Sequence, residues 1–328
     1  MMKKRILSAG LLLSVIGTVQ AQDKQVVDSI ANTLETRGLL TPKGQFEIEP
    51  SFSYSQNTSN RISIVGYSVL PALVVGLIEA SDADQATFTV GMAARYGLTN
   101  RIELELRAPW VYRYDTFTTR AASDGGGDEV RRFNSEGSAL GDIEAAIRYQ
   151  YNLESPPFWI GGLRIKSDTG ESPFDNEVND QGIFLDPPTG SGSWSIEPSM
   201  TLIYPSDPAV LFGTAGYTWN LGADAGRDLD DDGLANDKFN LGNSFFLGMG
   251  MGFAVNNRLS FSLGVNHRTV FKSSVNGQKT GSILQLDSLS TGFSLALTDK
   301  TALNMNLQAG LTEDAPDVEV NFSLPISF

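Results

Sequence analysis

Apolar and polar residues alternate along most of the chain from residue 44 to the C-terminus. The last eleven residues show this most clearly, with an apolar residue in every second place: Val318, Val320, Phe322, Leu324, Ile326 and Phe328. Glu319, Asn321 and Ser323 lie between them. A period of two is typical of a β-strand with one apolar and one polar face. The pattern therefore predicts a chain built from two-faced strands.

Twelve segments share this alternation and have the length, about ten residues, that a tilted strand needs to cross a membrane. They are residues 44–56, 86–96, 102–114, 139–151, 158–166, 194–204, 210–221, 241–255, 259–271, 283–297, 302–311 and 318–328. An open sheet edge would leave backbone groups without hydrogen-bond partners in lipid. We therefore expect the first and twelfth segments to pair antiparallel. The predicted fold is all-β, a 12-stranded antiparallel transmembrane β-barrel over residues 44–328.

Short and long connections alternate between the predicted strands. The short ones are residues 97–101, 152–157, 205–208, 256–258 and 298–301, and the long ones are residues 57–85, 115–138, 167–193, 222–240 and 272–282. The last connection, 312–317, breaks the rule by being short. Outer-membrane barrels have short periplasmic turns and long outer loops. The alternation of short and long connections therefore predicts a protein of the outer membrane of a Gram-negative bacterium, with both termini in the periplasm.

The N-terminus has the features of an export signal. Lys3, Lys4 and Arg5 precede an apolar run that ends in small residues, so residues 1–21 predict a signal peptide cleaved after Ala21. An N-terminal membrane anchor is the alternative. Residues 22–43 then predict a short helix with one apolar face, which is either a plug in the barrel or a periplasmic leader. The candidate plug residues on that face are Val26, Val27, Ile30 and Leu34.

Composition narrows the partners of this barrel. The chain has no cysteine and a formal net charge of −14, which argues against thiolate metal sites and against nucleic-acid binding. The closing strand, with Phe322 and the terminal Phe328, resembles the last strand of bacterial outer-membrane barrels. This resemblance implies outer-membrane lipid and the barrel-assembly machinery as partners.

Charged residues recur on the polar faces of the predicted strands. Because a charge facing lipid is costly, we expect them to line the lumen. They are Glu47, Glu49, Arg95, Glu103, Glu105, Arg107, Arg113, Asp142, Glu144, Arg148, Arg164, Lys166, Glu197 and Arg268. They predict either a structural ladder of cross-strand ion pairs or a charged constriction that selects solutes and holds the plug.

Two further patterns could carry chemistry. Asp228, Asp230 and Asp232, followed by Gly233, match the start of a Ca²⁺-binding loop, although Phe239 replaces the Glu expected at the twelfth place. An acidic surface loop without Ca²⁺ is the alternative, and no other cofactor is expected. A Ser-His-Asp site would need the single histidine, His267, beside a serine such as Ser262. We predict that the protein is not an enzyme.

Local sequences also resemble a known family. The segments are residues 96–110 (YGLTNRIELELRAPW), 140–148 (LGDIEAAIR), 188–192 (PTGSG) and 197–208 (EPSMTLIYPSDP). They are similar to the outer-membrane family of the MetA-pathway of phenol degradation, and within it most to the secretion channel of the functional-amyloid (Fap) system. This resemblance implies a homotrimer of plugged twelve-stranded barrels that exports amyloid subunits. Those channels carry a long coiled coil before the plug. In this sequence only residues 22–43 lie between the predicted signal-peptide cleavage site and the first predicted strand.

Three functions remain open at this point. The first is an outer-membrane transport channel that resembles the amyloid exporter and is gated by an N-terminal plug. The second is a passive channel for small aromatic or hydrophobic compounds. The third is a non-conducting surface or adhesive barrel whose long loops bind a partner.

Overall fold

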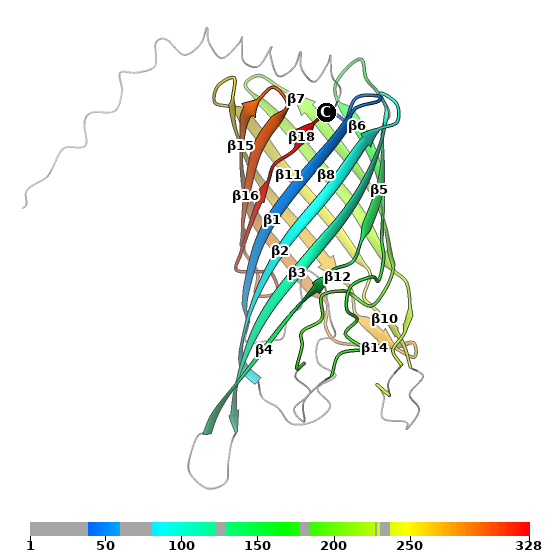
Figure 1. Cartoon of the computed structure of the whole chain (residues 1–328), viewed down its shortest axis with the longest axis vertical. Helices are drawn as coiled ribbons and strands as arrows, with labels where there is room; N and C mark the ends of the chain where they lie inside the picture. Colours follow the sequence, from blue (N-terminus) through cyan, green and yellow to red (C-terminus); the bar gives the residue numbers. More distant parts are fainter. Residues whose placement is uncertain (1–38, 60–79, 122–128, 178–183, 227, 230–236) are drawn as a thin grey trace, which may run out of the picture.

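A closed antiparallel barrel of twelve strands forms the body of the protein (Figure 1). The computed structural model describes residues 39–59, 80–121, 129–177, 184–226, 228–229 and 237–328. Within those residues no helix is long and apolar enough to cross a membrane. The predicted signal peptide lies outside the described residues.

Fourteen elements fill the twelve positions of the barrel, because β4 and β5 share one position beside β3, and β17 and β18 share another beside β1. The elements are β1 (Phe46–Ser59), β2 (Ala80–Gly97), β3 (Ile102–Ala121), β4 (Glu129–Leu140), β5 (Glu144–Gln150), β6 (Phe158–Lys166), β7 (Ser195–Pro205), β8 (Ala209–Asn220), β11 (Ser244–Ala254), β12 (Leu259–Val270), β15 (Leu284–Thr298), β16 (Thr301–Gly310), β17 (Val318–Ser323) and β18 (Ile326–Ser327). The five short connections 97–101, 152–157, 205–208, 256–258 and 298–301 lie with the C-terminus at one end of the barrel, the turn end. The long connections and the short connection 312–317 lie at the other end, the loop end (Figure 1).

The first and last strands close the barrel, as the sequence predicts. β1 pairs antiparallel with β17, with Phe52 opposite Phe322. At the turn end the backbone N–H of Phe328 donates to the carbonyl oxygen of Phe46 at 2.8 Å. Every barrel strand therefore has a neighbour on both sides, and no edge remains open to lipid.

The outer face of the wall is apolar. Val90 on β2 and Met249 on β11 are 58% and 52% exposed, and both alternate with residues of the opposite, inward face. Aromatic residues are exposed near both ends of the strands, among them Tyr96, Tyr151, Trp159, Tyr204, Trp110, Trp194, Trp219 and Phe271. An apolar outer band flanked by aromatic belts matches a bilayer. The protein is an outer-membrane β-barrel.

The predicted strand 139–151 is broken in the structure. Trp110 of β3 is opposite Leu140 of β4, whereas Arg107 is opposite Glu144 of β5, so the register shifts by one residue between these pairs. An extra residue of this kind is a β-bulge, which bends the strand and re-aims its side chains. Gly141 lies in the bulge, where an added Cβ would lie 3.0 Å from the ring of Pro109.

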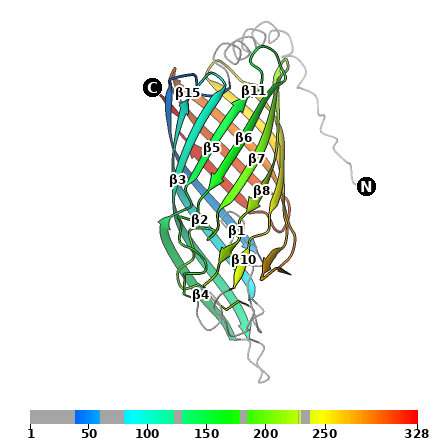
Figure 2. The same ribbon diagram turned by 90° about the vertical axis from the view of Figure 1, so that its right-hand side faces the viewer.

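Parts of the connections predicted as long loops are strands. β3 extends to Ala121 and β4 begins at Glu129, so most of residues 115–138 forms a hairpin that projects from the loop end (Figure 2). β1 and β2 likewise extend into residues 57–85. In this hairpin Tyr114 of β3 pairs with Glu136 of β4, and the pairing of the two strands continues to Ala121 and Glu129.

A small second sheet, the cap sheet, lies at the loop end. It has the order β14-β13-β10-β9 and consists of β9 (Ala223–Asp224), β10 (Lys238–Asn240), β13 (Ser273–Val275) and β14 (Gln278–Thr280). Phe174 from the connection 167–193 packs on it, with its ring 5.2 Å from that of Phe239. Phe239 is 1% exposed, and the buried cluster also contains Ala225, Leu241 and Val275. Three predicted loops are therefore joined by one hydrophobic core.

This core should make the cap sheet fold as a unit. We expect Phe239→Ala to destabilise it by about 3–5 kcal/mol, because the substitution leaves a cavity in a fully buried cluster. Trypsin should then cleave faster at Lys238 and Lys272, while the barrel keeps its resistance to unfolding in SDS. Leu221→Ala, which truncates an exposed side chain, is the control. Equal cleavage rates for both variants would contradict a cooperative cap.

Candidate functional site

Charged side chains line one half of the barrel wall, and most are paired across strands. Arg95 on β2 lies between the carboxylates of Glu47 (2.7 Å) and Glu49 (2.5 Å) on β1. On its other side it contacts Glu105 of β3 at 2.6 Å. Arg148 on β5 continues the chain of pairs, with contacts of 2.6 Å to Glu103 and 3.0 Å to Glu105. These six groups form a continuous ladder over four adjacent strands.

A second set of pairs continues the charged half towards β7. Arg164 on β6 contacts Glu144 of β5 at 3.3 Å and also Glu197 of β7. Thr218 on β8 donates a hydrogen bond to the second oxygen of Glu197 at 2.7 Å. The charged half ends there. Arg113, nearer the loop end of β3, pairs with Asp115 at 2.9 Å.

Asp142 and Lys166 are placed differently from the other predicted lumen residues. Asp142 is fully buried beside the connection 167–193 and pairs with Lys166 at 2.7 Å. It accepts hydrogen bonds from the backbone N–H groups of Gly170 (3.1 Å) and Ser191 (2.9 Å). The bulge at residues 141–143 turns Asp142 towards this connection. The pair therefore anchors the connection 167–193 at the loop end.

Two of the arginines predicted to line the lumen, Arg107 and Arg268, differ from the others in their ion pairing. Among the described residues, neither Arg107 nor Arg268 has a carboxylate within ion-pair distance. The guanidinium carbon of Arg268 lies 4.9 Å from the ring centre of Phe246, which is a cation–π geometry. It also donates to the hydroxyl of Ser244 at 2.9 Å.

The other half of the lumen wall, from β8 to β16, is almost free of charge. Its inward positions carry mainly glycine, serine, threonine and asparagine, with Phe212 and Phe246 as large apolar groups. Each ring lies against a glycine of the neighbouring strand. A Cβ on Gly250 would lie 2.6 Å from the Phe212 ring, and one on Gly216 would overlap the Phe246 ring. The glycines let both rings lie flat along the wall.

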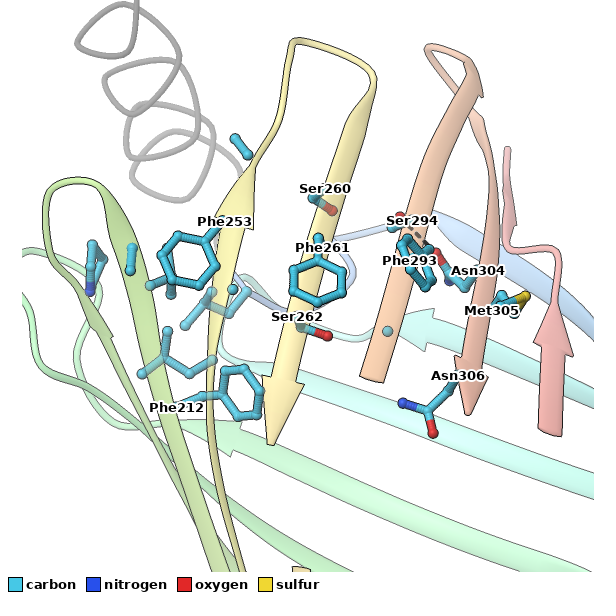
Figure 3. A pocket seen from close by; sticks show the side chains of 18 of the residues that line it. Phe212, Phe253, Ser260, Phe261, Ser262, Phe293, Ser294, Asn304, Met305 and Asn306 are labelled. Carbon is cyan, nitrogen blue, oxygen red and sulfur yellow. Dashed lines mark hydrogen bonds between the residues drawn. The ribbon is translucent and has the colours of Figure 1, made fainter. Parts of the chain in front are cut away.

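Three cavities lie in the barrel between the turn end and the loop end, the first beside the charged ladder and the other two beside the mostly uncharged half. The first, of about 1170 Å³ at the turn end, lies between Arg95 and Lys300. The second, of about 590 Å³, has Phe212 on one side and Asn304 and Asn306 on the other (Figure 3). The third, of about 330 Å³, contains Phe246, Arg268 and Glu319, and reaches the loop-end residues Ala315 and Pro316. The cavities offer a route that passes the charged ladder at the turn end and then runs beside the mostly uncharged half of the wall.

The first described residues of the chain enter the turn-end opening. The backbone N–H and the hydroxyl of Thr41 both donate to Glu103 at 2.7 Å, and the N–H of Leu39 donates to Gln150 at 3.4 Å. Leu40 is buried, and Leu39 lines both the first and the second cavity. The predicted plug residues Val26, Val27, Ile30 and Leu34 lie outside the described residues.

The predicted metal and catalytic residues do not come together in the part of the chain that the structure describes. Asp230 and Asp232 lie outside it, and its remaining residues include no group of three ligands suited to a metal. His267 is on the outward face, where it contacts Asp287 at 2.6 Å and Thr269 at 3.0 Å. Ser262 is five positions away on the inward face of the same strand. The Ser-His-Asp arrangement is not formed.

A family model described as MetA-pathway of phenol degradation matches residues 113–328. The chain belongs to this family. Two of the segments that predicted the family, 140–148 and 188–192, meet in the structure. Thr189 of the second donates to the carbonyl oxygen of Leu140 at 3.0 Å, and Ser191 contacts Asp142.

Several solved barrels are similar to this family member. The CymD monoaromatic hydrocarbon channel has 10% identity and a TM-score of 0.43 over 92% of each chain. The Ralstonia pickettii toluene transporter TbuX has 9% identity and a TM-score of 0.42 over 88% of this chain and 90% of its own. The beta domain of the Bordetella autotransporter BrkA has 13% identity and a TM-score of 0.46 over 87% of this chain and all of its own.

Proposed function

We propose that the protein is a passive outer-membrane channel for small aromatic or hydrophobic compounds. In this proposal the loop end faces outwards and both termini lie in the periplasm, as the alternation of short and long connections predicts. The observation that carries it is the series of cavities along an uncharged wall that presents Phe212 and Phe246. The family's link to phenol degradation supports the same class of solute.

The arrangement of charge favours uncharged solutes. In the charged half, close pairs neutralise part of the charge, since three arginines are shared by six carboxylates, and the negative surplus disfavours anionic solutes. An aromatic solute can stack on Phe212 and then on Phe246. Arg268, which already lies over Phe246, adds a cation–π contact at the loop-end side of the route.

Single-channel recording with water-soluble blockers tests this proposal. We expect phenol to interrupt the current through the reconstituted barrel more often than cyclohexanol, which has similar size but no aromatic ring. Phe212→Leu should reduce the difference while keeping the open-channel conductance. Equal interruption by both compounds would contradict an aromatic route. A barrel that never conducts would favour the non-conducting adhesive function.

Gating by residues 22–40 is a separate proposal. The contacts of Thr41 with Glu103 bring the chain into the turn-end opening, which supports a plug formed by the preceding residues. We expect deletion of residues 22–40 to raise the mean current of the reconstituted barrel. A variant with Thr41→Val, which loses one of the two hydrogen bonds to Glu103, should show an intermediate effect. An unchanged current after the deletion would contradict the plug.

Export of amyloid subunits and assembly into a homotrimer stay predictions from the family resemblance, because the described residues and the comparisons test neither. Ca²⁺ in the acidic loop likewise stays a prediction. The passive channel needs none of these.

A further inference from the structure

A pocket of about 530 Å³ lies at the loop end, between the barrel wall and the cap sheet. Tyr217 and Phe271 form its barrel side, and Lys272 and Lys279 are its charged groups. The Tyr217 ring lies 5.0 Å from that of Trp219 and 6.4 Å from that of Phe271. Tyr217 lies on the outward face of β8 and Phe271 directly follows β12, so these rings place the pocket at the outward side of the loop-end rim. The pocket shares no lining residue with the three cavities of the solute route.

Several polar groups that line this pocket lack an ion-pair or hydrogen-bond partner among the described residues. Both lysines are exposed, and neither has an ion-pair partner among the residues that the structure describes. Two cations without an ion-pair partner among those residues are notable in a chain of net charge −14. Asn220 and Asn243 also line the pocket, and their bonds within the described residues use Asn220 Nδ2 and Asn243 Oδ1. Asn220 Oδ1 and Asn243 Nδ2 have no hydrogen-bond partner within the described residues, which leaves one acceptor and one donor on residues that line the pocket.

The position of the pocket relative to the bilayer indicates which ligand it meets. Aromatic belts mark the level of the lipid headgroups, and Trp219 and Phe271 belong to the belt at the loop end. Towards the turn end the outward face of β11 continues as Phe245, Leu247 and Met249, all exposed. A ligand in the pocket can thus hold an anionic group near the lysines while its acyl chains lie on β11.

We infer that this pocket binds the phosphorylated sugar headgroup of a glycolipid in the outer leaflet. The lysines bind the phosphate, as basic pockets at a headgroup level do. The two asparagines and the Tyr217 ring contact the sugar. The volume of the pocket lies in the range of ordinary small-molecule sites.

Native mass spectrometry of the full detergent-purified chain tests the inference, with lipid A, a bisphosphorylated glucosamine disaccharide lipid, as the probe. We expect the double variant Lys272→Gln/Lys279→Gln to bind lipid A about tenfold more weakly than the unchanged protein. Lys238→Gln removes an exposed lysine of the same cap sheet that does not line the pocket, and it should bind lipid A normally. Lipid A without its phosphates should bind the unchanged protein as weakly as lipid A binds the double variant.

Three outcomes would overturn the inference. The first is unchanged affinity in the double variant, and the second is equal weakening by Lys238→Gln, which would indicate diffuse charge attraction. The third is equal affinity for soluble glucosamine 1-phosphate, which would show that the pocket takes a free phosphosugar and not a lipid headgroup. Channel recordings of the same variants separate this inference from the proposed function, because the pocket lies outside the solute route.

Discussion

A tryptophan in place of Asn306 should reduce the single-channel conductance by about half or more. Asn306 faces the lumen from β16 and lines the middle cavity of about 590 Å³, opposite Phe212. An indole at this position projects into the solute route. The barrel itself should still fold, because the cavity has room and the backbone pairing of Asn306 with Gly292 and Asn321 does not involve its side chain.

The control for this experiment lies on the same strand. Leu303 on β16 is exposed on the outward face, so Leu303→Trp places an equal side chain in lipid and should leave the conductance unchanged. Asn306→Ala should conduct at least as well as the unchanged protein. If Asn306→Trp folds and conducts normally, solutes do not pass along the uncharged half of the wall.

The barrel could be predicted from the sequence because lipid imposes the pattern that reveals it. Each wall residue faces either lipid or lumen, so one-residue alternation persists over every strand. The alternation identifies the strands, and the cost of an open sheet edge in lipid then predicts the pairing of the first and last strands, which the pairing of Phe52 with Phe322 confirms. The alternation also separated the inward charges from the outward apolar residues.

The cap sheet could not be predicted in the same way. Its strands have two or three residues each, which is too short for a period to appear. Phe239 illustrates the difficulty, because the sequence pattern marks it only as a departure from a Ca²⁺-binding loop, in which the twelfth residue would be Glu. In the structure it is the most buried member of the cap core. The contact that explains it, with Phe174, joins residues far apart in the sequence.

The lumen shows a second limit of sequence patterns. The alternation placed Asp142 and Glu144 on one face of one strand, but a single extra residue in the bulge turns Asp142 into the loop. The alternation also does not indicate how far along the barrel axis a residue lies, or which residues of the adjacent strands are its neighbours. The contact of Phe212 with Gly250, which shapes the route, depends on both the register and the closure of the barrel.

The largest loss of stability in the barrel wall itself is expected from Arg95→Met. Arg95 is the cation shared by Glu47, Glu49 and Glu105, and these four side chains are 10–24% exposed. Without it, Glu47 and Glu49 face each other on β1 with no cation in the ladder, whereas Glu105 keeps Arg148. Breaking a buried ion pair from one side costs about 3–5 kcal/mol, and water in the lumen should reduce this to about 2–4 kcal/mol. Urea titration of the barrel in lipid vesicles measures the change.

The ladder lies next to the seam of the barrel, where the last strand pairs with β1, so the loss of Arg95 affects barrel closure. Glu47 lies opposite Ser327 of β18, whose hydroxyl donates to the Glu47 carboxylate at 3.2 Å. Repulsion between Glu47 and Glu49 therefore acts where the last strand closes on the first. A second substitution, Glu49→Gln, should restore more than half of the lost stability, because it removes an uncompensated charge. Arg107→Met, which removes a lumen arginine without an ion pair among the described residues, should cost much less. Equal losses for Arg95→Met and Arg107→Met would show that the ladder does not hold the seam.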